Sequence, residues 1–295
     1  ARLDMGDCNQ HMMPNVTGQT TKCEVGHENH ETLHIDLQIL GEHHGLKDAP
    51  KIKAKWAMKL PFNVFNYKLY ANTKGYCPAD DEVSRSIYSH GVWEGFETIL
   101  FLDILHQGNK DNVVLDFGSN IGWYSVIAAK LGYSVHAFDS DTQINELHSL
   151  NALENAVAKK ITFHTGWIDK YSKPLGRWDG EIEFLKCDIE GNEQYMYSMT
   201  EHLFGVNKVK YALLEISPVF NDSYFELVPK IIANGYTAYR IPTKGTELME
   251  IYEQEPLQVI KDNMKIETSD WTEYIKSFSQ DNFLFIRNDL CSIHQ

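Results

Sequence analysis

The stretch "VVLDFGSNIGWYSV" (residues 113–126) decides the fold that this chain is expected to adopt. A short apolar run over 113–117 predicts a strand, and a helical pattern follows over 121–131 after a glycine-containing turn. Ligands of doubly wound sheets bind at such turns, beside the carboxyl ends of the strands. Gly118 permits a tight turn with close backbone approach, and Gly122 lets the start of the helix pack on the strand. The stretch therefore predicts a βα unit with a ligand-binding turn.

The alternation of strand and helix continues from this unit along the chain. Short β-rich runs separated by helical patterns of about 10–15 residues are typical of a parallel sheet covered on both faces. We therefore expect a Rossmann-like α/β domain over 81–295, with a mostly parallel doubly wound sheet and an antiparallel closing strand. Residues 242–280 have a mixed pattern and are expected to form a cap or an insertion. The expected strands are 113–117, 134–138, 160–165, 182–188, 209–216, 236–241 and 282–287, and the expected helices are 121–131, 141–155, 191–203 and 223–234.

Residues 1–80 are expected to form an N-terminal extension, with strands over 33–39 and 62–70 and a helix opening at Asp80. The extension contains an H-E-x-x-H pattern from His30 to His34, which would bind zinc only on a helix. Apolar and polar residues alternate from Leu33, so a strand is predicted instead. A strand separates the two histidine Cα atoms by roughly 13 Å, at about 3.3 Å per residue. We therefore expect no zinc protease and no metal site, with a looser site as the alternative, formed by His27, His30, His43 or His44.

Composition narrows the range of partners. Lys and Arg total 27 against 41 Asp and Glu, a formal charge of −14, which disfavours binding to nucleic acid. No apolar run approaches the roughly 18 residues that a membrane helix requires. The five cysteines form no C-x-x-C pair, so a cytoplasmic protein is expected. Two glycosylation tripeptides, at Asn15 and Asn221, leave the secretory lumen as the alternative.

An acidic residue is expected at the end of the second strand of the sheet. Asp139 lies 139 − 116 = 23 residues after Asp116, a position suited to the hydroxyls of an adenosine ribose. This spacing serves both NAD and S-adenosylmethionine (SAM). The dinucleotide pattern G-x-G-x-x-G, however, has Asn120 at its middle glycine and Trp123 at its third. A ligand without phosphates tolerates these two replacements better than a dinucleotide does. The turn therefore favours a SAM-binding protein over an NAD-type oxidoreductase, and a turn that binds no ligand is the remaining alternative.

Five stretches together resemble the FkbM-like family of SAM-dependent methyltransferases, over about residues 80–220. "VVLDFGSNIGWYS" is similar to the family's first motif, and "FLKCDIEGNE" (184–193) resembles its K-x-D-x-E-G-x-E signature. Asp139 and Ser140 depart from the family's usual Glu-Pro, and Cys187 from a usual aliphatic residue. The other three stretches are "GVWEGFETILF" (91–101), "HAFDSD" (136–141) and "YALLEISP" (211–218).

The resemblance implies a set of site residues. Asp188, Glu190 and Glu215 are expected to be catalytic, although Glu190 and Glu193 also suit the start of a helix. Lys186 alternates with Asp188 along a strand and is expected to pair with it. Trp167 is a candidate to flank adenine, with a core position as its alternative. The expected cofactor-binding residues are Glu94, Asp116, Gly118, Ser119, Asn120, Gly122, Asp139, Ser140, Trp167 and Asp188.

The implied function is transfer of a methyl group from SAM to a hydroxyl group of a carbohydrate or natural-product acceptor. The protein's task in such a reaction is to align the nucleophile with the methyl group and to take up a proton. A protein that binds SAM or a glycan without catalysis is a further alternative. The oligomeric state is left open by the sequence.

Overall fold

The computed structural model describes residues 82–83, 86–87, 92–176, 180–241 and 256–291. The H-E-x-x-H pattern and the strands expected at 33–39 and 62–70 lie outside these residues. The helix expected from Asp80 is described only at 82–83 and 86–87, which are helical.

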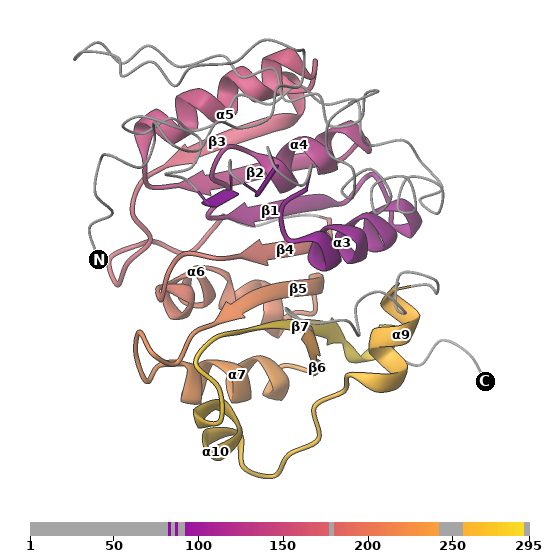
Figure 1. Ribbon diagram of the computed structural model, residues 1–295, viewed down its shortest axis with the longest axis vertical. Helices are drawn as coiled ribbons and strands as arrows, with labels where there is room; N and C mark the ends of the chain where they lie inside the picture. The colour runs from indigo at the N-terminus through magenta and orange to yellow at the C-terminus, as the bar shows by residue number, and fades with distance from the viewer. Residues whose placement is uncertain (1–81, 84–85, 88–91, 177–179, 242–255, 292–295) are drawn as a thin grey trace, which may run out of the picture.

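A seven-stranded sheet forms the centre of the domain, in the order β3-β2-β1-β4-β5-β7-β6 (Figure 1). Strands β1 to β5 pair in parallel, and β7 runs antiparallel to both of its neighbours, β5 and β6. This confirms the expected mostly parallel doubly wound sheet with an antiparallel closing strand. The strands are β1 (Val113–Phe117), β2 (Ser134–Asp139), β3 (Ile161–Thr165), β4 (Ile182–Cys187), β5 (Val209–Ile216), β6 (Tyr236–Ile241) and β7 (Asp281–Arg287).

Helices cover both faces of the sheet (Figure 1). Side chains of α3, α4, α5 and α9 share one buried cluster with the sheet, and those of α6, α7 and α10 share another. In the stretch 242–280, α9 packs against α3 and α10 against α7, so its described part adds one helix to each layer. The helices are α3 (Gly95–Gln107), α4 (Trp123–Lys130), α5 (Thr142–Glu154), α6 (Glu193–Gly205), α7 (Tyr224–Ala233), α9 (Pro256–Asn263) and α10 (Trp271–Lys276), with short 3₁₀ turns at Ala158–Lys160 and Asn288–Leu290.

Helix α3 was not among the expected helices. Nine of its 13 residues are buried, because it packs on the sheet, α4 and α9 at once. A helix buried on most sides has no polar stripe, so the 3.6-residue periodicity that reveals surface helices is absent. None of the described helices is both long and apolar enough to cross a membrane.

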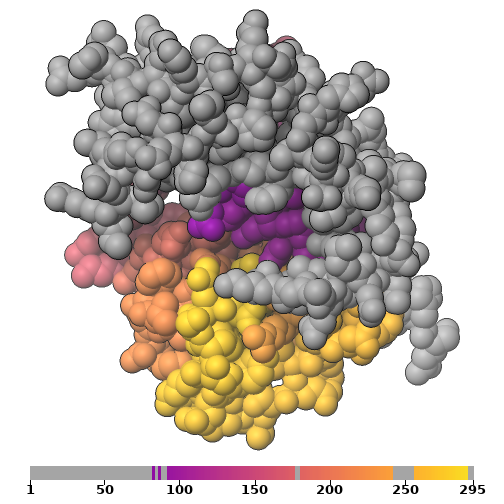
Figure 2. Space-filling model, viewed as in Figure 1, coloured from indigo at the N-terminus to yellow at the C-terminus, as the bar shows by residue number. Residues whose placement is uncertain are grey.

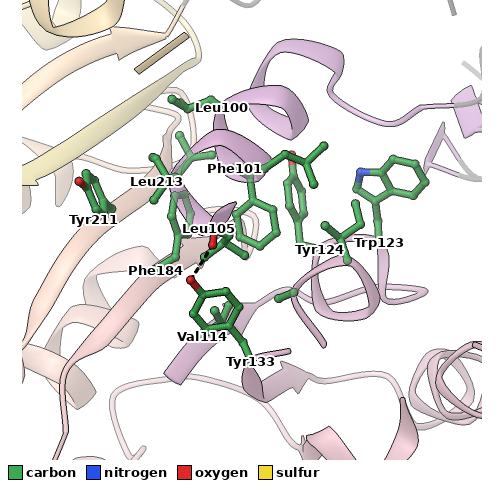
Figure 3. Close-up of a cluster of buried hydrophobic side chains, with 14 of the residues drawn as sticks. Leu100, Phe101, Leu105, Val114, Trp123, Tyr124, Tyr133, Phe184, Tyr211 and Leu213 are labelled. Carbon is green, nitrogen blue, oxygen red and sulfur yellow. Dashed lines mark hydrogen bonds between the residues drawn. The ribbon is translucent and has the colours of Figure 1, made fainter. Parts of the chain in front are cut away.

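An aromatic cluster fixes α3 and α4 on the sheet (Figure 3). The Phe101 ring lies edge-on to Phe184 of β4 at 4.9 Å and to Tyr124 of α4 at 5.1 Å, between ring centroids. The Tyr133 hydroxyl donates to the Leu105 carbonyl at 2.7 Å, which ties the end of α3 to the start of β2. Tyr124 is thereby held with its ring in the core and its hydroxyl toward the edge of the sheet, where the polar residues gather.

Candidate active site at the carboxyl edge of the sheet

The turn after β1 is built around a close backbone approach at Gly118. Its φ is +79°, and a Cβ at this position would lie 1.8 Å from the carbonyl oxygen of Asp188. The Gly118 amide donates to the Phe138 carbonyl at 2.9 Å, and the Asp188 amide donates to the Phe117 carbonyl at 3.0 Å. The carboxyl ends of β1, β2 and β4 therefore meet at this one glycine.

Replacing Gly118 by Ala is expected to lower the free energy of unfolding by more than the cost of a positive φ alone. A left-handed conformation costs a non-glycine residue about 1–3 kcal/mol, and here the new methyl group would also overlap a backbone oxygen. Gly132→Ala is the matched control, since Gly132 has a φ of +106° with open space around it. Urea unfolding measures both. Equal losses for the two variants would show that the contact with Asp188 is not constraining.

The second half of the turn is held by the Asp139 carboxylate. The Asn120 amide donates to its Oδ2 and the Asp141 amide to its Oδ1, each at 2.9 Å. Asn120 has a φ of +48°, and its side-chain oxygen accepts from the Ile121 amide at 2.7 Å. A carboxylate has about four acceptor positions, so Asp139 keeps capacity for further hydrogen bonds while it shapes the turn.

Gly122 approaches a different element from the one expected. A Cβ at Gly122 would lie 2.2 Å from the imidazole ring of His148, which belongs to α5. The sequence-based interpretation had this glycine pack the helix start on a strand, so the partner is corrected to α5. His148 is fully buried, and burial lowers the pKa of its imidazole to about 3, so the ring packs in the neutral form.

Ser119 places an unsatisfied hydroxyl in the turn. Among the described residues, its Oγ is one of the few buried side-chain atoms without a hydrogen-bond partner. Ser140, by contrast, is half-buried at the end of β2. Asp116 points from β1 to α4, where Ser125 donates to it at 2.5 Å, and burial raises the pKa of Asp116 to about 6. Buried polar atoms are normally paired, so the Ser119 hydroxyl is a candidate to bond a ligand in the turn.

A buried lysine lies beneath the carboxyl edge and binds two acidic residues. Lys186 Nζ is 3.4 Å from Asp188 Oδ2 and 3.6 Å from Glu94 Oε2, which confirms the pairing expected with Asp188. The Tyr124 hydroxyl donates to the same Glu94 oxygen at 2.6 Å. Burial alone would lower the pKa of Lys186, but the charges of Glu94 and Asp188 outweigh it and raise that pKa. The lysine is therefore a permanent cation inside the domain.

Asp188, the residue after β4, and Glu215 of the neighbouring strand β5 form a carboxyl pair in which each group shifts the pKa of the other. Burial would raise the pKa of Asp188, but Lys186 and the hydrogen bond from Glu215 hold it below its ordinary value. Burial and then the charge of Asp188 raise the pKa of Glu215 to about 9. At neutral pH, Glu215 is accordingly the protonated donor and Asp188 the ionised acceptor.

Glu215 is expected to make folding stability fall with rising pH. The pKa of Glu215 is raised from 4.5 to about 9 in the folded domain, so its contribution is fully present below pH 4.5 and is lost as pH rises through about 9. Glu215→Gln, which retains a donor without the titration, is expected to show a shallower decline over that range. Urea midpoints measured across the range test this, and parallel curves for the two proteins would refute it.

The remaining acidic candidates separate into two roles. Glu190 is exposed, although partial desolvation of its carboxylate and then the charge of Asp188 raise its pKa. Glu193 is fully buried, and its oxygens accept from the Ile189 amide at 2.9 Å and from the Tyr224 hydroxyl. Glu193 therefore shapes the loop that carries Glu190, while Glu190 itself is exposed to solvent.

Trp167 lies in the loop after β3, with 75% of its surface exposed. The Gly166 amide donates to the Asp139 carbonyl at 3.1 Å, which places this loop next to the end of β2. The alternative of a core tryptophan is excluded by this exposure. The indole is available to a ligand that extends past Asp139.

Sequence reasoning missed three residues of the site. Tyr124 orients Glu94 through a hydrogen bond. The position of Tyr124, two residues after Gly122 in the turn motif, could have indicated that it belongs to the site. Glu97 is buried and accepts from Asn282 of β7 at 3.0 Å, and burial followed by the charge of Glu94 raises the pKa of Glu97 to about 7. A glutamate within the apolar run "GFETILF" was a usable signal, whereas nothing near Asn282 pointed to the site.

No three histidine, cysteine, aspartate or glutamate side chains gather to hold a metal ion within the residues that the structure describes. The strand order, the antiparallel β7 and the glycine turn between β1 and α4 define the class of domain. It is the Rossmann-like fold of SAM-dependent methyltransferases.

Comparisons with known proteins return methyltransferases. The chain is 33% identical over 94 residues to the ribosomal protein L11 methyltransferase of Campylobacter lari, and the match spans about a third (32%) of each protein. No family model matches the chain. Among solved structures, a putative O-methyltransferase from Klebsiella pneumoniae is similar with a TM-score of 0.42 and 13% identity, over 68% of this chain and 83% of that one. Magnesium protoporphyrin IX methyltransferase from Synechocystis PCC 6803, solved with bound SAM, is similar with a TM-score of 0.43 and 15% identity, over 82% of this chain and 98% of that one.

Proposed function

We propose that this protein is a SAM-dependent methyltransferase that methylates a hydroxyl group of a carbohydrate or natural-product acceptor. One observation carries the proposal: Asp188, ion-paired with Lys186 at 3.4 Å, lies against the glycine turn at the carboxyl edge of the sheet. The pKa of Asp188 is lowered and that of its neighbour Glu215 is raised. In this fold, ligands bind at that edge. The proposed proton acceptor is thus adjacent to the proposed cofactor-binding turn.

The turn has features that fit SAM. The buried Ser119 hydroxyl is unsatisfied, and Gly118 leaves no side chain between the turn and β4. The Asp139 carboxylate, which holds the turn, is the proposed partner of the ribose hydroxyls. The acidic residues of the edge also suit a cofactor that carries a sulfonium and an ammonium group. Glu94 is the residue that we expect to bind the amino-acid portion of SAM, since Tyr124 and Lys186 fix its carboxylate.

The chain's own residues orient and deprotonate the acceptor. When bound, SAM supplies a methyl group on a positively charged sulfur, so the protein needs little chemical activation. Asp188 accepts a hydrogen bond from the acceptor hydroxyl and takes its proton as the new bond forms. Glu215, protonated, orients the Asp188 carboxylate, and Lys186 keeps it ionised before the acceptor arrives.

The choice of a hydroxyl acceptor is supported by the FkbM-like signature. Lys186, Asp188, Glu190, Gly191 and Glu193 match its K-x-D-x-E-G-x-E pattern. The lysine and the first acid of this pattern form the buried ion pair, and the last acid supports the loop of the middle one. The signature residues therefore act as one structural unit around the proposed proton acceptor.

Calorimetric titration with S-adenosylhomocysteine, the expected product, tests the cofactor. We expect saturable one-to-one binding in buffer that contains EDTA, and loss of binding in Asp139→Ala. Titration with NADH separates the proposal from an NAD-type oxidoreductase. Binding of NADH alone would overturn it.

Transfer of a labelled methyl group from SAM into a cell extract tests the acceptor class. We expect label in the soluble carbohydrate and small-molecule fraction. Label confined to precipitated protein would instead support a protein acceptor, which is what the name of the Campylobacter lari relative describes for that enzyme.

A further inference from the structure

A shallow hollow of about 470 Å³ lies between the β5–α7 loop and α10. Its volume is within the range of small-molecule sites, about 300–1,000 Å³. The proposed chemistry assigns no role to it. Its lining includes Val219, Asp222, Phe225, Thr272, Lys276 and Phe278.

The hollow opens at the same edge of the sheet as the carboxyl pair. Pro218, which lines it, is three residues beyond Glu215, a distance of at most roughly 11 Å at about 3.6 Å per residue. On the other wall, Phe278 precedes β7 by three residues, and β7 begins with Asp281 opposite Ile216 at the end of β5. The β5 to β7 segments form the orange and yellow lower half of the molecule in Figures 1 and 2. The hollow is therefore a neighbour of the reaction centre.

Exposed apolar side chains connect the two places. Val219 and Phe220 are 66% and 53% exposed, although both are large and apolar. The Cβ of Phe220 lies 2.9 Å from the position that a Cβ on Gly191 would take, next to Glu190. Val219 thus lines the hollow, and the next residue, Phe220, contacts the loop that carries Glu190. A ligand that spans both places would cover these two side chains.

The lining combines aromatic faces with separated polar groups. Phe225 and Phe278 are half-buried, and Lys276 Nζ lies 5.7 Å from the centroid of the Phe225 ring. Lys276 also pairs with Glu273 at 3.4 Å, so its charge is already partly compensated. Asp222 contributes a carboxylate and Thr272 a hydroxyl. A sugar ring has an apolar C–H face for the aromatic rings and hydroxyls that both donate and accept, which matches this set better than an anion does.

We propose that this hollow is a sugar subsite, which holds the ring next to the one whose hydroxyl is presented to Asp188. The assignment to the acceptor rests on the proposed methyl transfer. With this subsite, the β5–α7 loop and α10 determine how many sugar rings the acceptor needs in order to bind well. Disaccharides and trisaccharides bind better than monosaccharides, because only they reach both places.

Saturation-transfer NMR tests the subsite on the full chain with S-adenosylhomocysteine present. The probes are methyl glycosides of glucose, galactose and mannose together with the corresponding disaccharides and trisaccharides. We expect at least one oligosaccharide series to bind, and Lys276→Ala to weaken it by about tenfold. Lys265→Ala is the matched control, since Lys265 is 51% exposed and paired with Glu267, much as Lys276 is 53% exposed and paired with Glu273.

The outcomes separate this proposal from the proposed function. Binding of S-adenosylhomocysteine without any oligosaccharide binding overturns the subsite and leaves the cofactor assignment intact. Oligosaccharide binding that is equal in Lys276→Ala, Lys265→Ala and the unchanged protein also overturns it. Oligosaccharide binding that depends on Lys276, without binding of S-adenosylhomocysteine, supports the sugar site and contradicts methyl transfer.

Discussion

Replacing Lys186 by Met is expected to lower the free energy of unfolding by about 3–5 kcal/mol at neutral pH. Lys186 is the buried cation between Glu94 and Asp188, and its removal leaves two desolvated carboxylates without a counter-charge. The large cost arises from those unpaired charges and not from the lost attraction alone. Urea unfolding followed by fluorescence measures the effect.

The destabilisation by Lys186→Met should shrink in acid. The ion pair holds the pKa of Asp188 below its ordinary 3.8, so this stability is present above that value and is lost as pH falls through the folded-state pKa. Lys230→Met is a suitable control, because Lys230 pairs with Glu226 at 2.9 Å on the exposed face of α7. That variant should lose no more than about 1 kcal/mol. Similar losses in the two variants would contradict the buried network.

The second large effect is expected in turnover. Asp188→Asn should lower the rate of methyl transfer by about 10²–10⁴-fold, since the amide cannot accept the proton of the acceptor hydroxyl. The affinity for S-adenosylhomocysteine should change little, because the glycine turn and Asp139 are untouched. Labelled methyl transfer into the extract measures the first quantity, and calorimetry measures the second.

Asp262→Asn serves as the control for Asp188→Asn. Asp262 is an exposed carboxylate on α9 that bonds to Gln258 of the same helix. Its replacement should leave both transfer and cofactor affinity unchanged. A transfer rate that survives in Asp188→Asn would show that Asp188 is not the proton acceptor, and Glu190 would be the next candidate.

The strands were predictable because their signal is local. Apolar runs such as 113–117 and 182–187 are buried on both faces, and each lies between turn residues that the sequence shows directly. The pairing of Lys186 with Asp188 was predictable for the same reason, since residues two apart on a strand share a face. Helix α3 was missed because its burial on most sides removes the periodicity.

The contacts that complete the site were not predictable in the same way. Tyr124 meets Glu94 across 30 residues of sequence, and Glu215 meets Asp188 across 215 − 188 = 27. Such pairs depend on which strands become neighbours, and no local pattern encodes that. The packing of Gly122 against His148 is a similar case, where the glycine was noticed but its partner was not.

The position of β7 has a consequence for synthesis on the ribosome. Of the seven described strands, β7 is translated last, yet it lies between β5 and β6 in the sheet. Until residues 281–287 leave the exit tunnel, the edges of β5 and β6 that pair with β7 stay unpaired in the nascent chain, and unpaired strand edges promote aggregation. Asn282 also brings its amide to Glu97 only at that stage. Chaperone protection of the nascent chain, and activity itself, should therefore depend on this one late strand.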